Sequence, residues 1–129
     1  RELPIGSDGW IVSREAIREV CRIKGTDDTE NWVPYFTDTN LFKTGFYHVE
    51  DELVRNSKLR LTVDTPGDFR FITIIFERLY GRKSIFLTRD IAELCEREPQ
   101  LAMINRHIEQ RAWKPIVLAD HEENIKDKV

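Results

Sequence analysis

Apolar residues recur at spacings of three and four along several stretches of the chain, the pattern of an amphipathic helix. The clearest of these helices has a well-marked start. Thr65 is the expected N-cap, Pro66 opens the first turn, and Asp68 lies three residues past the cap, as in a capping box. Gly81 marks the end of the helix. The side chains expected to face the core are those of Phe69, Ile72, Ile75, Phe76 and Leu79.

Other helices are expected on both sides of this one. Ser13 is placed to cap a helix that ends at Gly25, and a short helix is expected over 32–36. Thr88 is the expected cap of a further helix, which Pro99 breaks before it opens the next one. The inward-facing residues of the two longer helices are expected to be Ala16, Ile17, Val20, Cys21, Ile91, Leu94 and Cys95.

Four stretches carry the residue types and alternation of strands. They are Trp10 to Ser13, Gly45 to Glu50, Leu59 to Val63 and Lys114 to Asp120. The resulting order, strand, helix, helix, strand, strand, helix, helix, helix, predicts a mixed α/β fold. The strands are few for the apolar helix surface, so we expect residues outside this chain to complete the sheet.

Composition places the chain among ordinary globular domains. It has 129 residues, 40% of them hydrophobic, and a net charge of -3. We expect a single, partial domain over 1–129 with a flexible tail at 121–129. The acidic balance argues against nucleic-acid or anionic-membrane partners, and no apolar run reaches the roughly 20 residues of a membrane helix. A cytoplasmic location is expected, with Cys21 and Cys95 as reduced core thiols.

Asp64 is the one candidate for chemistry that local pattern singles out. It lies between an expected strand and the helix that Thr65 caps. At the carboxyl end of a strand a carboxylate can bind Mg²⁺ together with substrate phosphates. Local pattern alone favours the other role of a carboxylate here, which is to stabilise the positive end of the helix dipole. The sequence contains no GxxxxGK[ST], GxGxxG or GxSxG motif, and its three histidines are scattered without metal spacing.

The stretch "LRLTVDTPGDFRFITIIFERLY" resembles the "R-[WL]-T-V-D-T-P-E-D-[LF]" block of bacterial and archaeal cytidylyltransferases. The branch it most resembles is the spore coat polysaccharide biosynthesis protein F type, and the related CMP-KDO synthetases share "V-D-T-P-E-D". Three other stretches resemble family blocks in the same order: "LPIGSDGWIVSREAI", "DDTENWVPYF" and "FLTRDIAELCEREPQLAMINRHIEQR". Together they cover roughly residues 2 to 111.

The resemblance implies the C-terminal half of a nucleotide-diphospho-sugar transferase-like fold, a three-layer α/β/α sandwich. It implies transfer of CMP from CTP to an acidic sugar or related polyol, for surface polysaccharide biosynthesis, with Mg²⁺ and in a homodimer. Asp64 matches the metal-binding aspartate of the motif. The family lines its sugar pocket at positions that match Gly6, Asp8, Glu30 and Asn31.

Departures from the family pattern limit what this chain can do. Asn31 replaces the histidine of the family's "E-H" pair, and Trp10 lies where the family has a carboxylate in "D-V-E-V". The N-terminal CTP-binding segment, "A-R-x-x-S-x-R-L-P-G-K", has no counterpart here. We therefore expect that this chain alone has no catalytic residue and that it is inactive as a fragment. The alternative is a non-catalytic module derived from such an enzyme, which serves in oligomerisation or partner binding.

Overall fold

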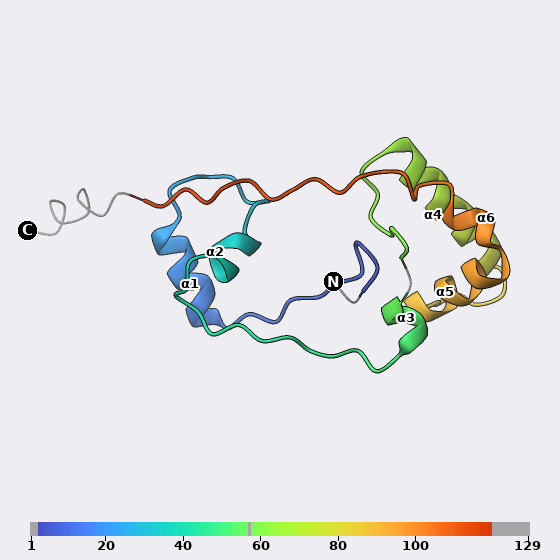
Figure 1. Cartoon of the computed structure of the whole chain (residues 1–129), viewed down its shortest axis with the longest axis horizontal. Coiled ribbons are helices and arrows are strands. Elements are labelled where there is room, and N and C mark those ends of the chain that lie inside the picture. The colour runs from blue at the N-terminus through green and yellow to red at the C-terminus, as the bar shows by residue number, and fades with distance from the viewer. Residues whose placement is uncertain (1–2, 57, 120–129) are drawn as a thin grey trace, which may run out of the picture. The chain divides into compact units, whose positions relative to one another are not determined.

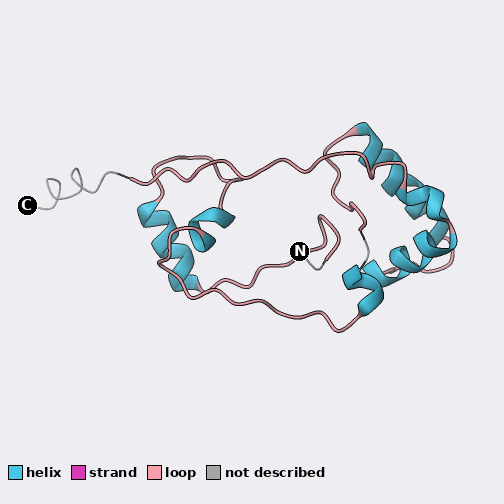
Figure 2. Cartoon of the chain, in the orientation of Figure 1, coloured by secondary structure: helices cyan, strands magenta, loops and turns pink. Residues whose placement is uncertain are grey.

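The computed structural model describes residues 3–56 and 58–119, and these residues form six helices (Figures 1 and 2). In place of strand ladders they contain two isolated β-bridges, a parallel one between Ile5 and Arg60 and an antiparallel one between Lys24 and Leu118. The helices are α1 (Arg14–Ile23), α2 (Val33–Thr37), α3 (Glu52–Asn56), α4 (Pro66–Leu79), α5 (Thr88–Arg97) and α6 (Pro99–Ala102).

The predicted three-layer α/β/α fold is wrong for this chain, because the described residues contain no sheet. A strand is stable only when a neighbouring strand pairs with its main-chain N–H and C=O groups. The strand predicted over Gly45 to Glu50 has no such neighbour among the described residues, and its Phe46 and Tyr47 are 101% and 87% exposed. Residues 59–63 and 114–119 make one bridge each, and 10–13 make none.

The chain divides into two compact units. The first combines Arg1–Gly9 with Tyr47–Gln110 and contains α3 to α6; the second combines Trp10–Phe46 with Arg111–Val129 and contains α1 and α2. The tail predicted at 121–129 lies outside the described residues. No helix in the described part of the chain is both long enough and apolar enough to cross a membrane.

The start of α4 confirms the capping prediction. Thr65 Oγ1 accepts a hydrogen bond from the Asp68 amide at 3.2 Å, and the Asp68 carboxylate accepts one from the Thr65 amide at 3.1 Å. The predicted buried face is only partly right, since Phe69 and Phe76 are 65% and 50% exposed. Asp68 is fully buried and points inward, so the helix is rotated toward a different face. The hydrophobic residues buried on that face are Phe71, Ile75 and Leu79.

The first unit has one hydrophobic core, to which α4, α5 and α6 all contribute. Helix α5 packs against both α3 and α6. The predicted cap of α5 is off by one residue: Thr88 is its first residue, and the Asp90 carboxylate accepts a hydrogen bond from the Leu87 amide at 2.6 Å. The buried members of the core are Leu59, Phe71, Ile75, Leu79, Ile91, Ala92, Leu94, Cys95 and Leu101.

The second unit has a smaller core between α1 and α2. Ser13 caps α1 as predicted, with its Oγ accepting from the Ala16 amide at 3.1 Å. Cys21, however, is exposed, so the prediction of a core thiol is wrong for Cys21 and confirmed for Cys95. After α1 the chain becomes extended. Any residue other than glycine at position 25 would place its Cβ 2.6 Å from the carbonyl oxygen of Leu118, so Gly25 fits where a larger residue would clash. The buried core residues are Val20, Ile23, Tyr35 and Phe36.

Candidate functional site

The candidate site begins where two segments of the first unit run alongside each other. The Ile5 amide donates to the Leu59 carbonyl at 3.0 Å, and the Leu61 amide donates to the Ile5 carbonyl at 2.7 Å. Gly6 has a φ of 89°, and a Cβ there would lie 2.6 Å from the Thr62 nitrogen. Only glycine adopts this conformation readily and permits this close approach. Gly6, which the family resemblance predicts to line a substrate pocket, permits the close approach of the two segments at this junction.

Arg60 is the centre of a buried ionic network at the junction. Its Nε donates to Asp68 Oδ1 and a terminal nitrogen donates to Asp64 Oδ2, both at 2.9 Å. Asn105 donates from its side-chain amide to Asp68 and to the Arg60 carbonyl, again at 2.9 Å. The Arg60 side chain is 5% exposed and that of Asp68 is 0% exposed. Two buried opposite charges are thus paired and hydrogen-bonded, as buried ions must be.

The electrostatics of Asp68 follow from these contacts. Burial by itself raises the pKa of this carboxyl, because it disfavours the charged form. Hydrogen bonds from Arg60, Asn105, Thr65 and the Asp64 amide outweigh burial and hold the pKa of Asp68 well below its usual range. Asp68 is therefore ionised at neutral pH, and its lone pairs are occupied by the protein.

Asp64 differs from Asp68 in being open to solvent. Its side chain is 53% exposed, and its Oδ1 accepts from Thr62 Oγ1 at 3.2 Å while Oδ2 is held by Arg60. Asp68, not Asp64, accepts hydrogen bonds from the two amides just before α4, those of Asp64 and Thr65. The described contacts of Asp64 are therefore those of a positioned carboxylate with one open side.

The oxygen atoms at this junction decide whether these residues suit Mg²⁺. Only Asp64 has free oxygen lone pairs, because those of Asp68 are used by Arg60, Asn105 and Thr65. The described residues hold no group of three or more side chains of the types that ligate metals. One carboxylate suits a magnesium ion whose other ligands are water and substrate phosphates. The arrangement fits a substrate-borne ion and does not fit a resident, fully protein-ligated one.

The other predicted site residues fall in both units. Asp8 is exposed and belongs to the first unit with Gly6 and Asp64, whereas Glu30 and Asn31 belong to the second. The Asn31 amide donates to the Lys114 carbonyl at 3.0 Å, and its oxygen accepts from the Lys114 amide at 2.9 Å. Its side chain thus pairs with main chain as a strand would. Substrate contacts by these residues stay a prediction.

Sequence reasoning missed the residues that fix Asp64 in place. Arg60 lies between Leu59 and Leu61, and a charged residue between two apolar ones is the only hint in the sequence that Arg60 has a buried partner. Asn105 gives a weaker signal, as a single amide amid apolar residues at helical spacing. Neither hint identifies the partner, since Arg60 and Asn105 are 45 positions apart.

A groove of about 820 Å³ also lies in the first unit, between α3, α5 and α6. Its lining combines apolar residues, Cys95 among them, with the charged side chains of Lys58, Glu96 and Arg106. Burial, with a smaller effect of Glu98, raises the pKa of the Cys95 thiol to about 11. A thiol in that state is a poor nucleophile.

Comparison with known proteins adds one distant relative. The chain is 27% identical over 88 residues to an uncharacterized protein of the archaeon Methanocaldococcus jannaschii, a match that covers 67% of this chain and 35% of that protein. The chain thus aligns with about a third of the length of that relative. No family model and no solved structure matches the chain.

Proposed function

We propose that this chain is the acceptor-sugar side of a cytidylyltransferase-like enzyme, with Asp64 as the carboxylate that binds the magnesium ion of the nucleotide. In this role the chain also contributes to a homodimer. The intact enzyme would act in the cytoplasm on CTP and an acidic sugar or related polyol. The observation that carries the proposal is the half-exposed Asp64 carboxylate, anchored by Arg60 beside the fully buried Asp68.

The chemistry of CMP transfer explains why such a carboxylate is useful. Mg²⁺, when bound, neutralises charge on the transferred phosphate and the departing pyrophosphate. Asp64 would orient that ion toward the junction, and Arg60 keeps the carboxylate in one position. The contribution of this chain is therefore to position the ion, and we assign phosphate binding to a part of the proposed enzyme that has no counterpart among these residues.

A metal-binding measurement tests the role of Asp64. We would titrate the chain with Mn²⁺, a spectroscopic substitute for Mg²⁺, and follow bound metal by electron paramagnetic resonance. Asp64→Asn should abolish the weak site, whereas Asp27→Asn, which removes an exposed carboxylate in the second unit, should leave it unchanged. Equal Mn²⁺ binding by the Asp64→Asn and Asp27→Asn variants would refute the assignment.

Calorimetry tests whether this chain binds the acceptor sugar and not the nucleotide. We expect heat on titration with an acidic sugar such as 3-deoxy-octulosonate, and none with CTP beyond the heat of Mg²⁺ alone. Binding of CTP by this chain would contradict the proposal that the nucleotide side lies elsewhere. Failure of a panel of acidic sugars to bind would contradict the acceptor role.

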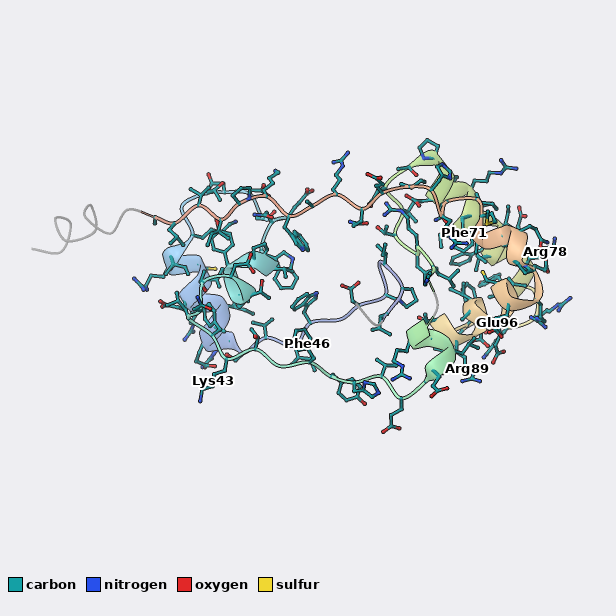
Figure 3. All side chains as sticks on the ribbon, in the orientation of Figure 1. Lys43, Phe46, Phe71, Arg78, Arg89 and Glu96 are labelled. Carbon is teal, nitrogen blue, oxygen red and sulfur yellow. The ribbon has the colours of Figure 1, made fainter. Side chains whose placement is uncertain are left out.

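The exposed hydrophobic residues favour a second candidate, a non-catalytic partner-binding or oligomerisation module. Ile11 is 103% exposed, and Phe46 projects from the extended segment before α3 (Figure 3). Apolar side chains this exposed are typical of surfaces that another protein covers. The two candidates separate on ligand binding: the module would bind neither Mn²⁺ at Asp64 nor an acidic sugar.

A further inference from the structure

Helix α4 carries an aromatic seam on the face that its own unit leaves open. The seam consists of Phe69, Thr73, Phe76 and Tyr80, at spacings of four, three and four residues. This is the spacing of the a and d positions at which two helices pack side by side. Phe69, Phe76 and Tyr80 are 65%, 50% and 61% exposed.

The opposite face of α4 faces its own core. Phe71 and Ile75 are both fully buried there, and Figure 3 shows Phe71 on α4. The seam therefore lies outside the core of the first unit, which it touches through the contact of Phe76 with Phe86. A helix that is apolar on both faces is expected to have a neighbour on each.

Two unpaired charges of opposite sign flank the seam. Arg70 follows Phe69 and Glu77 follows Phe76, so both lie on the same flank. Both are exposed, and neither makes an ion pair or side-chain hydrogen bond with any described residue. Arg78, on the same helix, does find a partner, since it pairs with Glu98 at 3.5 Å. Seven residues separate Arg70 from Glu77, too many for contact within one helix.

We propose that α4 packs antiparallel against α4 of a second copy of this chain. In that arrangement the aromatic side chains of each seam face the seam of the other copy, and the small Thr73 lies near the two-fold axis. Arg70 of each copy faces Glu77 of the other, so the surface complements itself. A parallel pair would instead place the two Arg70 side chains at one level and the two Glu77 side chains at another.

The loop that follows α4 extends the same surface. Phe86 packs edge-to-face on Phe76, with ring centroids 5.0 Å apart, and its neighbours Ile85 and Leu87 are 75% and 63% exposed. Five exposed side chains would contribute to the interface: Phe69, Phe76, Tyr80, Ile85 and Leu87. If each buries roughly a further 100 Å², the interface covers about 1,000 Å² over both copies. This is the lower end of specific interfaces, so the dimer should form reversibly. The inference gives a surface to the dimerisation in the proposed function, and it does not depend on metal binding.

Charge reversal measured by sedimentation velocity tests this surface. The wild-type chain should shift from monomer to dimer with concentration. Arg70→Glu and Glu77→Arg should each raise the dissociation constant roughly tenfold or more, because each places like charges together. The double variant should recover most of the lost affinity. Arg97→Glu, the same charge change at an exposed site on α5, is the matched control and should have no effect.

Mixing the two single variants gives the sharpest outcome. Arg70→Glu and Glu77→Arg should dimerise poorly alone but pair with each other, because the mixed dimer restores both contacts. Circular dichroism would verify that each variant folds. A chain that stays monomeric at high concentration, or charge reversals without effect, would overturn the proposal. The proposal would also be overturned if each single variant weakened the dimer and neither mixing the two variants nor combining the substitutions restored it. A lost metal site at Asp64 would leave all these results unchanged, so the two proposals fail separately.

Discussion

The two units of this chain solve the same problem in different ways. Each must hold an extended segment without a sheet to accept it. In the first unit the segment around Arg60 is held by a buried charge network with Asp68 and Asn105. In the second, the segment around Val117 is held by polar side chains that stand in for a strand: Asn31 pairs with Lys114 main chain, and the Tyr35 hydroxyl donates to the Val117 carbonyl at 2.8 Å.

The difference predicts how each unit fails. A buried ion pair that loses one partner leaves an uncompensated charge, which is far more costly than a lost neutral hydrogen bond. The first unit should therefore be sensitive to charge and pH. The second should respond mainly to loss of individual amide or hydroxyl groups, and by smaller amounts.

The chain carries a separate probe for each unit. Its three tryptophans, Trp10, Trp32 and Trp113, all belong to the second unit, so their fluorescence reports its unfolding. Cys95 is buried in the first unit, so its reaction with a thiol reagent reports opening there. Cys21 is exposed in the second unit and serves as the internal reference for reagent activity.

The largest effect is expected from removing Arg60. Arg60→Leu leaves the Asp68 carboxylate buried without its cation and should destabilise the first unit by about 3–5 kcal/mol. Urea titration followed by circular dichroism and Cys95 reactivity measures this loss. Arg14→Leu, which removes an exposed arginine paired with Glu15, is the control and should cost less than about 1 kcal/mol. If Arg60→Leu also lowers the free energy of unfolding by less than about 1 kcal/mol, the ionic network contributes little to stability.

Acid should open the first unit before the second. The folded-state pKa of Asp68 lies below its unfolded value, so its stabilisation is complete above roughly pH 4 and is lost as the pH falls further. As the pH falls below that value, Cys95 should become accessible to an acid-active thiol reagent before the tryptophan fluorescence changes. Asp68→Asn should make the stability of the first unit less dependent on pH. Simultaneous opening of both units at every pH would contradict the distinction between them.

The features that the sequence predicted correctly are those set by near neighbours. Thr65 and Asp68 cap α4 because they are three residues apart, and Ser13 caps α1 for the same reason. Strands are different, because the partner of residues 45–50 must come from elsewhere and none is present among the described residues. Local pattern could suggest a strand there and could not test it.

The candidate site shows the same limit. Asp64 stood out because it adjoins a cap, but its anchor is a pair of contacts with Arg60 and Thr62 that only the folded chain reveals. The rotation of α4 was also unpredictable, since it depends on Asp68 pointing inward to Arg60. That rotation turned Phe69 and Phe76 outward and created the aromatic seam.

The smallest effect is expected in the second unit, from Asn31→Ala. The variant loses both hydrogen bonds to Lys114 main chain and should cost about 1–3 kcal/mol, because each part-buried hydrogen bond contributes about 0.5–1.5 kcal/mol. The tryptophan fluorescence transition in urea should shift to lower concentration, while Cys95 protection should not change. Glu30→Ala removes the neighbouring exposed side chain and is the matched control. If Asn31→Ala leaves the transition in place, then Tyr35 and the Lys24–Leu118 bridge hold the segment without it. If it also exposes Cys95, the two units depend on each other for stability.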